Sequence, residues 1–310
     1  MVGTAKGLER AGEGLVGLLP DAPRIALRRA VRNRVERRRL KRADLTVIAH
    51  PKSGSTWLRF QLARVYQRKF GLPESVIPRI ERYHRLNPAI PRLHMAGYQY
   101  IARVIARPAP DGELTGKSVV FLLRHPLDVI VSLYFHIQKH ALHERKLFND
   151  WPLDLSEVAM IDFALHSHWG LREAIRFYNG CARHAAAMQS AHIVRYEDMR
   201  QHPARELAAI LRFAGTETSP EDADDAARFT SFERLRAAER DNAFDSARLR
   251  PGDPNDPESF KVRRAKVFGY RDYFSPEQCG ELEAIIDDEL DPKLGYSSQD
   301  IRKKTEAGAA

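Results

Sequence analysis

A lysine, a glycine and three hydroxyl side chains stand together in the segment Pro51-Lys52-Ser53-Gly54-Ser55-Thr56. An apolar, β-rich run precedes the segment and a helical pattern follows it, which is typical of a strand, a tight loop and a helix. Backbone N–H groups and the positive end of a helix attract an anion there, and a glycine lets the backbone approach it. Lys52 could then reach charge that develops on a transferred group. We therefore predict a phosphate-type loop; a helix start capped by serine and threonine is the alternative interpretation.

The order of the lysine and the glycine separates this loop from the Walker A loop of common NTPases. A Walker A loop reads GxxxxGK[ST], with the lysine directly after a glycine. Here Lys52 precedes Gly54, and no magnesium-binding Walker B run is evident. The pattern argues against an ordinary ATP or GTP hydrolase, and a nucleotide kinase or NTPase-like phosphotransferase is kept as an alternative.

Three short apolar runs are predicted to be strands, at residues 44–50, 118–123 and 192–194. Helical patterns lie between and after them, at residues 57–66, 128–140, 160–190, 203–214 and 277–290. Strands that alternate with helices favour a central parallel sheet covered on both faces, so we predict a P-loop-like, three-layer α/β fold. We expect loops and short helices at 71–115, a polar loop at 240–260 and a frayed polar tail after Tyr296.

The composition is that of a globular protein. The chain has 310 residues and a mass of 35.4 kDa, with 43% hydrophobic and 29% charged residues. This is enough for one large core and excludes a mostly disordered chain. Two cysteines, Cys181 and Cys279, exclude a disulfide scaffold and a cysteine-rich zinc site. The sequence has no apolar run that could span a membrane and no secretory cleavage pattern, so we expect a cytoplasmic protein.

The net charge of +9 arises from one N-terminal segment. Residues 24–42 hold ten basic residues and one acid, Glu36, so the rest of the chain is close to neutral. A nucleic-acid-binding domain would carry basic charge on its folded body, so no nucleic-acid partner is expected. Apolar residues recur in the segment near helical spacing. They leave two interpretations: a solvated basic helix, or an amphipathic helix in peripheral contact with the inner face of the membrane.

The segment HPKSGSTWL, residues 50–58, resembles the PKSGTTWL loop of the sulfotransferases that use 3′-phosphoadenosine 5′-phosphosulfate (PAPS). The chain looks like a bacterial-type member that resembles the cytosolic sulfotransferases, whose loop cradles the 5′-phosphosulfate. Residues 119–136 (VVFLLRHPLDVIVSLYFH) are similar to a second family segment, in which an arginine and a serine hold the 3′-phosphate. Arg124 and Ser132 match these two positions. A guanidinium binds phosphate through two parallel hydrogen bonds, whereas the alternative for Arg124 is an ion pair with Asp128.

Further matches fall on the adenine side of the family's donor site. VRYEDM, residues 194–199, is similar to the family's YEDL turn and places Tyr196 at an adenine contact. Thr230-Ser231-Phe232 resembles the family's TSF, whose threonine and phenylalanine touch the adenine. Trp57 would stack on the other face of the base, since an aromatic ring supplies stacking at small entropic cost. Ordinary core packing is the alternative for each of these aromatic side chains.

The last match is VRRAKVFGYRDYFS, residues 262–275, which is similar to the family's RKGxxGxW segment over the 3′-phosphate. Arg263 and Arg264 match its basic pair. Ala265 and Phe268 replace its two glycines, and an L-residue is strained wherever a glycine adopts positive φ. The resemblance covers a sulfotransferase domain at residues 45–296, between a basic helical segment at 1–44 and a polar tail at 297–310.

The resemblance implies an enzyme of the EC 2.8.2 type. It would transfer a sulfuryl group from PAPS to a hydroxyl, in preference to an amine, and release 3′-phosphoadenosine 5′-phosphate (PAP). Lys52 would stabilise charge on the leaving oxygen, and the 5′ end would be held by Ser53, Gly54, Ser55 and Thr56. In-line positioning and charge stabilisation supply the catalysis without a metal. The acceptor is a small molecule, a glycan or a lipid-linked compound.

A hydroxyl acceptor needs a general base, which family members take from a histidine or a glutamate between the loop and the Arg124 strand. The first candidate is His94, near the family's strand-end histidine, and a hydrogen-bonded structural role is its alternative. The other candidates are His84, Glu81 and Glu74. His136 and His140 either line the acceptor cleft or lie at the surface. Without a base, the chain would be a non-catalytic nucleotide-fold protein that docks on membranes.

Overall fold

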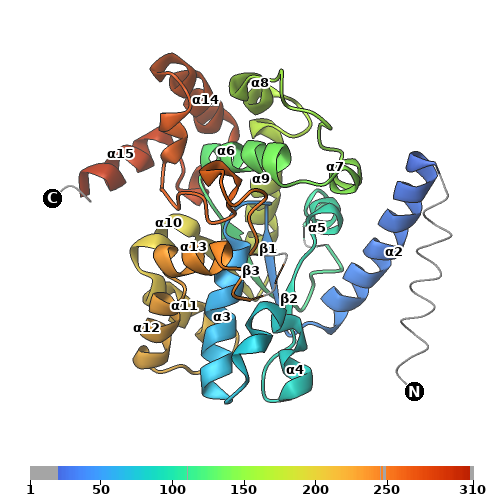
Figure 1. Cartoon of the computed structure of the whole chain (residues 1–310), viewed down its shortest axis with the longest axis vertical. Coiled ribbons are helices and arrows are strands. Elements are labelled where there is room, and N and C mark those ends of the chain that lie inside the picture. Colours follow the sequence, from blue (N-terminus) through green and yellow to red (C-terminus); the bar gives the residue numbers. More distant parts are fainter. Residues whose placement is uncertain (1–19, 110, 245, 247–248, 308–310) are drawn as a thin grey trace.

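The computed structural model describes residues 20–109, 111–244, 246 and 249–307. Its central sheet has four parallel strands in the order β2-β1-β3-β4 (Figure 1). The strands are β1, Leu45–Ala49; β2, Leu93–Met95; β3, Ser118–Leu123; and β4, Ala191–Arg195. Every connection between these strands contains at least one helix, because parallel neighbours need a crossover.

The helices before β4 are α2, Asp21–Arg42; α3, Ser55–Lys69; η1, Glu74–Arg82; α4, Tyr83–Leu86; α5, Tyr98–Ile105; α6, Pro126–Lys139; α7, His143–Asn149; α8, Met160–Leu165; and α9, Leu171–Ala187. The helices after β4 are α10, Tyr196–Gln201; α11, Pro203–Phe213; α12, Pro220–Phe229; α13, Phe232–Arg240; η2, Pro257–Ser259; η3, Gly269–Asp272; α14, Pro276–Glu289; η4, Pro292–Leu294; and α15, Ser298–Ala307.

Helices cover both faces of the sheet, which confirms the predicted three-layer α/β fold. On β3, Val119, Phe121 and Leu123 face a core that also holds residues of α5, α6, α9 and α14. Val120 and Leu122 face a second core, with residues of α3, η1 and α11. A strand that is buried on both faces has an unbroken apolar sequence, which is why the run SVVFLL predicted β3 correctly.

The carboxyl ends of β1, β3 and β4 meet at one edge of the sheet. Leu123, the last residue of β3, aligns with Arg195, the last residue of β4. Arg124 follows β3 directly, and Tyr196 follows β4 directly. The phosphate-type loop follows β1 at the same edge. Open parallel sheets bind their ligands outside the carboxyl ends of their strands, so the sheet brings the three segments together where a ligand is expected.

Two parts of the chain are more regular than the sequence predicts. The segment 71–115 contains β2 and α5 besides the short helices that were expected. The strand β2 has three residues, too few to show the alternation by which a strand is recognised. After Tyr296, where a frayed tail was predicted, the chain continues as α15. Ile301 is buried there, and α15 contacts α14, so packing holds the polar segment in a helix.

The basic segment forms α2, which contacts α5 and α7 (Figure 1). Ile25, Glu36 and Leu40 are its buried residues, so the apolar positions of the segment do not share one free face. Residues 1–19, the first part of the predicted N-terminal segment, lie outside the described residues. None of the described helices combines the length and the apolar character needed to cross a membrane.

Candidate active site

The loop after β1 turns sharply at two residues with left-handed backbone. Lys52 has φ of 75° and Gly54 has φ of 97°, and Gly54 is the N-cap of α3. A Cβ at Gly54 would lie 2.7 Å from Cδ2 of Tyr196. The glycine is therefore required both by its backbone angle and by the ring packed against it. Ser53 is buried below the loop, with its Oγ 3.2 Å from the hydroxyl of Tyr178.

Positive charge surrounds Lys52. Burial, followed by the charges of Lys261, Arg124 and Arg145, lowers the pKa of Lys52 from 10.5 to about 7. An anion bound beside the lysine would favour its charged form and raise this pKa again. The electrostatics of the site thus suit a ligand with several negative charges.

Arg124 joins the loop to the C-terminal part of the site. Its Nη1 donates to the carbonyl oxygen of Lys52 at 3.3 Å, and its Nη2 donates to that of Lys266 at 3.3 Å. The guanidinium carbon lies 4.5 Å from the centroid of the Tyr196 ring. The ion pair with Asp128, which the sequence offered as an alternative role, is present at 3.6 Å. With this ion pair formed, the guanidinium still contacts both the loop at Lys52 and the C-terminal segment at Lys266.

Two buried carboxylates hold the chain at residues 261–270 against the site. Asp128 accepts hydrogen bonds from the backbone N–H groups of Phe268, at 2.9 Å, and Tyr270, at 3.0 Å. Glu239 of α13 accepts from the N–H of Lys261 at 2.6 Å and from that of Val262 at 2.8 Å. These contacts bring the segment that resembles the family's RKGxxGxW motif to the carboxyl edge of the sheet.

This segment keeps a left-handed backbone at both positions where the family motif has glycine. Ala265 has φ of 50° and Phe268 has φ of 55°. The two L-residues therefore carry backbone strain that glycine would not. The neighbouring arginines already have acidic partners: Arg263 lies 2.7 Å from Glu258, and Arg264 lies 2.7 Å from Asp272. An anion at these arginines would compete with the two carboxylates.

The aromatic side chains predicted for the adenine side come together in part. The indole Nε1 of Trp57 donates to the carbonyl oxygen of Thr230 at 3.0 Å, and its ring centroid lies 5.5 Å from that of Tyr196. The structure therefore brings Trp57, Tyr196 and Thr230 to one place. Phe232 begins α13 and is half-buried, and Ser132 is half-buried on α6.

Three of the four base candidates, His94, His84 and Glu81, line one cavity of about 1080 Å³. His94 is buried, and its Nε2 lies 3.3 Å from Oε2 of Glu36 on α2. The N–H of Gly97 donates to the same oxygen at 3.0 Å. Burial alone would raise the pKa of Glu36, but the contacts with His94 and Gly97 lower it overall. The basic helix α2 therefore places the ionised carboxylate of Glu36 beside His94.

The other base candidates have different partners. The Nδ1 of His84 lies 2.7 Å from a backbone carbonyl oxygen. Glu81 pairs with Arg59 of α3. Glu74 pairs with Arg64 at 2.9 Å, is exposed, and is absent from the residues that line the cavity. The structure therefore separates Glu74 from the three candidates that share the cavity.

His136 lies on α6 and His140 is the C-cap residue of that helix, with the two ring centroids 5.5 Å apart. Burial, followed by the charge of Lys52, lowers the pKa of both, and that of His140 falls to about 4. His136 is buried, and among the described residues its Nδ1 has no hydrogen-bond partner. The charge of Lys52 therefore acts on both rings, and His136 is not a surface residue.

Sequence reasoning missed a polar cluster directly beside the loop. His50 places Nε2 at 3.0 Å from Oε2 of Glu173 and Nδ1 at 3.0 Å from the carbonyl oxygen of Pro51. The hydroxyl of Tyr98 donates to the other oxygen of Glu173. His50 could have been noticed because it precedes the loop. No local pattern links it to Tyr98 and Glu173, which come from two distant helices.

Comparisons with known proteins agree with this geometry. The family model described as the sulfotransferase domain matches residues 113–295. The chain is 21% identical to a 3-alpha-hydroxysteroid sulfotransferase of Cavia porcellus, over 82% of this chain and 87% of that protein. It is 22% identical to a flavonol 3-sulfotransferase of Flaveria bidentis, over 80% and 81%.

Solved structures show the same fold. Mouse sulfotransferase SULT7A1, complexed with PAP, aligns with a TM-score of 0.50 and 16% identity over 87% of this chain and 90% of that chain. Retinol dehydratase, in complex with androsterone and PAP, aligns with a TM-score of 0.53 and 18% identity over 79% and 80%. Since the family model spans more than half of the sequence, the chain belongs to the sulfotransferase domain family.

Proposed function

We propose that this sulfotransferase moves the sulfuryl group of PAPS to a hydroxyl of its acceptor by in-line displacement. The observation that carries the proposal is the packing of both Gly54 and Arg124 against Tyr196 at the carboxyl edge of the sheet. It combines a loop of backbone donors, an aromatic ring and a guanidinium. Such groups suit a phosphorylated adenosine. Two solved sulfotransferase-fold proteins bind PAP, the product that PAPS would leave.

In this proposal the donor lies along the edge of the sheet. Its 5′ end is held by Lys52, Ser53, Gly54, Ser55 and Thr56. Its 3′-phosphate is held by Arg124, Ser132, Arg263 and Arg264, the last two exchanging Glu258 and Asp272 for the phosphate. Its adenine lies among Trp57, Tyr196, Thr230 and Phe232.

The reaction exchanges one oxygen on sulfur for another. The bond from the acceptor oxygen to sulfur forms as the bond from sulfur to the bridging phosphate oxygen breaks, and the acceptor proton passes to a base. Lys52 stabilises the negative charge that develops on the leaving oxygen. Its pKa near 7 in the ligand-free protein rises when the anionic donor binds, so the lysine is charged during transfer.

We propose His94 as the base, with His84, Glu81 and Glu74 as the alternatives. The support for His94 is its place on the cavity wall and the Glu36 carboxylate 3.3 Å from its Nε2. Nδ1 would take the acceptor proton, and Glu36 would stabilise the imidazolium that results, as a buried carboxylate does for a catalytic histidine in other enzymes.

Release of PAP from PAPS tests the proposal, with panels of hydroxyl and amine acceptors and detection of the sulfated product. We expect acceptor-dependent release by the native protein and none by Lys52→Ala, whose fold should be kept. His94→Ala should lower kcat and leave the affinity for PAP unchanged. Full turnover by Lys52→Ala would refute the mechanism, and full turnover by His94→Ala would move the base to another candidate.

The outer face of α2 supports a peripheral membrane contact as part of the proposal. Leu27 and Val31 are 43% and 57% exposed one turn apart, and Arg34 and Arg38 are exposed on the same stripe of the helix. Apolar side chains among arginines suit an anionic lipid surface. Sedimentation with phosphatidylserine vesicles should therefore be lost in Leu27→Asp/Val31→Asp and kept in the exposed control Leu153→Asp. Equal sedimentation of the two variants would refute the proposed membrane contact.

A further inference from the structure

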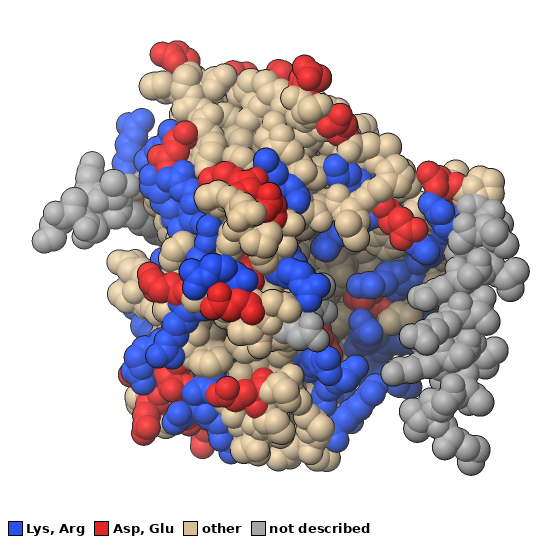
Figure 2. All heavy atoms as spheres, viewed as in Figure 1, with Lys and Arg blue, Asp and Glu red and all other residues tan. Residues whose placement is uncertain are grey.

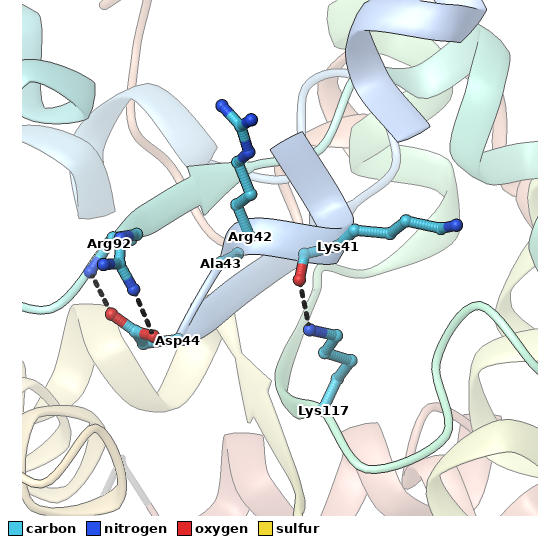
Figure 3. Close-up of a pocket in the computed structure, with 6 residues that line it drawn as sticks. All are labelled: Lys41, Arg42, Ala43, Asp44, Arg92 and Lys117. Carbon is cyan, nitrogen blue, oxygen red and sulfur yellow. Dashed lines mark hydrogen bonds and ion pairs between the residues drawn. The ribbon is translucent and has the colours of Figure 1, made fainter. Parts of the chain in front are cut away.

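Two basic cavities lie at the edge of the sheet opposite to the phosphate-type loop. Figure 2 shows Lys and Arg side chains gathered beside α2, whose C-terminal end lines both cavities. In the smaller one, Asp44, Arg92 and Lys117 each directly precede a strand, so they mark the amino ends of β1, β2 and β3 (Figure 3). Lys52 instead follows the carboxyl end of β1. The groups that position Lys52 are therefore to be found in the packing around the loop itself.

The backbone of Lys52 is fixed by a hydrogen bond on each side. Its φ of 75° lies in the left-handed region, which an L-residue keeps only where its surroundings impose it. The carbonyl oxygen of Lys52 accepts from Arg124 at 3.3 Å. The carbonyl oxygen of Pro51 lies 3.0 Å from Nδ1 of His50. These two oxygens belong to the peptide planes before and after Lys52, so the two contacts together set its backbone angles.

Glu173 orients the imidazole that binds Pro51. A carbonyl oxygen only accepts, so Nδ1 of His50 carries a hydrogen, while Nε2 lies 3.0 Å from Oε2 of Glu173. Burial alone would raise the pKa of Glu173, but the contacts with His50 and with the hydroxyl of Tyr98 lower it overall. Its place in the first turn of α9 also favours a carboxylate. An ionised carboxylate only accepts as well, so a hydrogen on each ring nitrogen satisfies both contacts.

The ring of His50 is shielded from water. Only 1% of the residue is exposed. The rings of Tyr98, Phe177 and Tyr178 surround it, with centroids 5.0, 5.7 and 6.3 Å from that of the imidazole. Hydrogen bonds are stronger in such an apolar enclosure, and a buried polar atom that loses its partner there is costly. The aromatic wall therefore holds the imidazole in the orientation that reaches Pro51.

The helix α9 also supports the rest of the donor loop. The hydroxyl of Tyr178 lies 3.2 Å from Oγ of Ser53. The same hydroxyl donates to the carbonyl oxygen of Arg124 at 2.8 Å and accepts from its N–H at 3.2 Å. Glu173 thus acts on the start of the loop through His50, and Tyr178 acts on its middle and on Arg124. One helix sets the position of the loop relative to the arginine.

We propose that His50 and Glu173 are positioning residues of the sulfuryl transfer. They hold the peptide between Pro51 and Lys52 in the conformation that presents the loop to the 5′ end of the donor. Tyr98 keeps the carboxylate of Glu173 oriented by donating to its other oxygen. The inference rests on the proposed sulfuryl transfer, because it assigns the groups that support Lys52 in that reaction.

The test is calorimetric titration with PAP and with adenosine 3′-monophosphate, which lacks only the 5′-phosphate that the loop would bind. His50→Asn keeps an amide nitrogen near the position of Nδ1, and His50→Gln keeps one near the position of Nε2. We expect His50→Gln to bind PAP about tenfold more weakly than the native protein, because the carbonyl group of Pro51 loses its donor and the loop shifts. His50→Asn should stay within about threefold. Adenosine 3′-monophosphate should bind equally to all three proteins.

Two further variants separate positioning from a general loss of structure. Glu173→Gln keeps the shape of the side chain and removes its charge, so it should weaken PAP binding and leave that of adenosine 3′-monophosphate unchanged. The matched control is His184→Asn, because His184 is also a buried histidine and lies near the other end of α9. It should bind both nucleotides as the native protein does, even where urea unfolding shows a lower stability.

Failure of the inference can be told apart from failure of the donor site. Equal PAP affinities of His50→Asn and His50→Gln, or an equal loss for both nucleotides in His50→Gln, would overturn the positioning role while native PAP binding upholds the donor site. Native PAP affinity in Glu173→Gln would remove Glu173 from that role. A native protein that binds adenosine 3′-monophosphate as tightly as PAP would contradict the loop as a phosphate site, and the positioning role with it.

Discussion

Replacing Gly54 by alanine tests the packing on which the donor site depends. The new Cβ would lie 2.7 Å from Cδ2 and 3.1 Å from Cε2 of Tyr196. The ring cannot retreat freely, because it is buried with Trp57 5.5 Å away on one side and the Arg124 guanidinium 4.5 Å away on another. The substitution must therefore shift either the loop or the ring, and each of them belongs to the proposed donor site.

The cost has two parts, and Gly71 separates them. A left-handed alanine costs about 1–2 kcal/mol, and a forced contact in a packed region adds about 1–3 kcal/mol. Gly54→Ala should thus lower the free energy of unfolding by about 2–5 kcal/mol. Gly71 has φ of 60°, and a Cβ added there would meet no atom within 4 Å, so Gly71→Ala carries the backbone cost alone.

Urea unfolding and calorimetric titration with PAP measure the two consequences. Gly54→Ala should lose more stability than Gly71→Ala and should bind PAP at least about tenfold more weakly, since a shift of Tyr196 also moves Arg124. Gly71→Ala should bind PAP as the native protein does. Equal stability losses in the two variants, together with native PAP affinity in Gly54→Ala, would refute the reasoning.

Three further predictions concern strain, protonation and the buried acid. Ala265→Gly should raise the free energy of unfolding by about 0.5–1 kcal/mol in urea, because relief of a left-handed alanine exceeds the entropy cost of glycine; a loss of stability would show that Ala265 is not strained. The pKa of Lys52, about 7, predicts that PAP affinity is constant below pH 7 and falls by up to about tenfold per pH unit above it, since Lys52 must then take up a proton when PAP binds. Calorimetry across pH 6 to 9 should show this proton uptake. A PAP affinity that does not change with pH would contradict the lowered pKa. Glu36→Ala should lower the free energy of unfolding by about 1–3 kcal/mol and should lower kcat, because it leaves His94 and the N–H of Gly97 without their partner. A native kcat in this variant would contradict the role of Glu36 in supporting His94 as the base.

The sequence predicted the elements that carry strong local patterns. The strands β1, β3 and β4 are short apolar runs that end at recognisable turns, and their order along the chain indicated the parallel sheet. The resemblance to the sulfotransferase family predicted Arg124 and Tyr196 as donor-site residues. The structure places both beside the loop, because they follow β3 and β4 and parallel strands share one carboxyl edge.

The remaining features depend on contacts between distant residues. Glu36 meets His94 and Gly97 across some sixty residues of chain, and nothing in the basic run 24–42 marks its one acid as buried. The sequence showed only that Ala265 replaces a glycine of the family motif and would be strained with a positive φ. In the structure Ala265 has this left-handed backbone, and the hydrogen bond from the N–H of Phe268 to Asp128 fixes the residues that follow. Long-range packing decides both, and a local pattern does not record it.

The most direct test of the central claim is the affinity of the native protein for PAP compared with ADP, with Arg124→Ala titrated in parallel. Both nucleotides carry two phosphates, but the second phosphate is on the 3′ oxygen in PAP and at the 5′ end in ADP, and the proposed site reads the 3′-phosphate through Arg124. We expect PAP to bind at least about tenfold more tightly than ADP, and the preference to disappear in Arg124→Ala. Equal affinity for the two nucleotides in the native protein would contradict a PAPS-dependent donor site and would favour an ordinary nucleotide-binding enzyme.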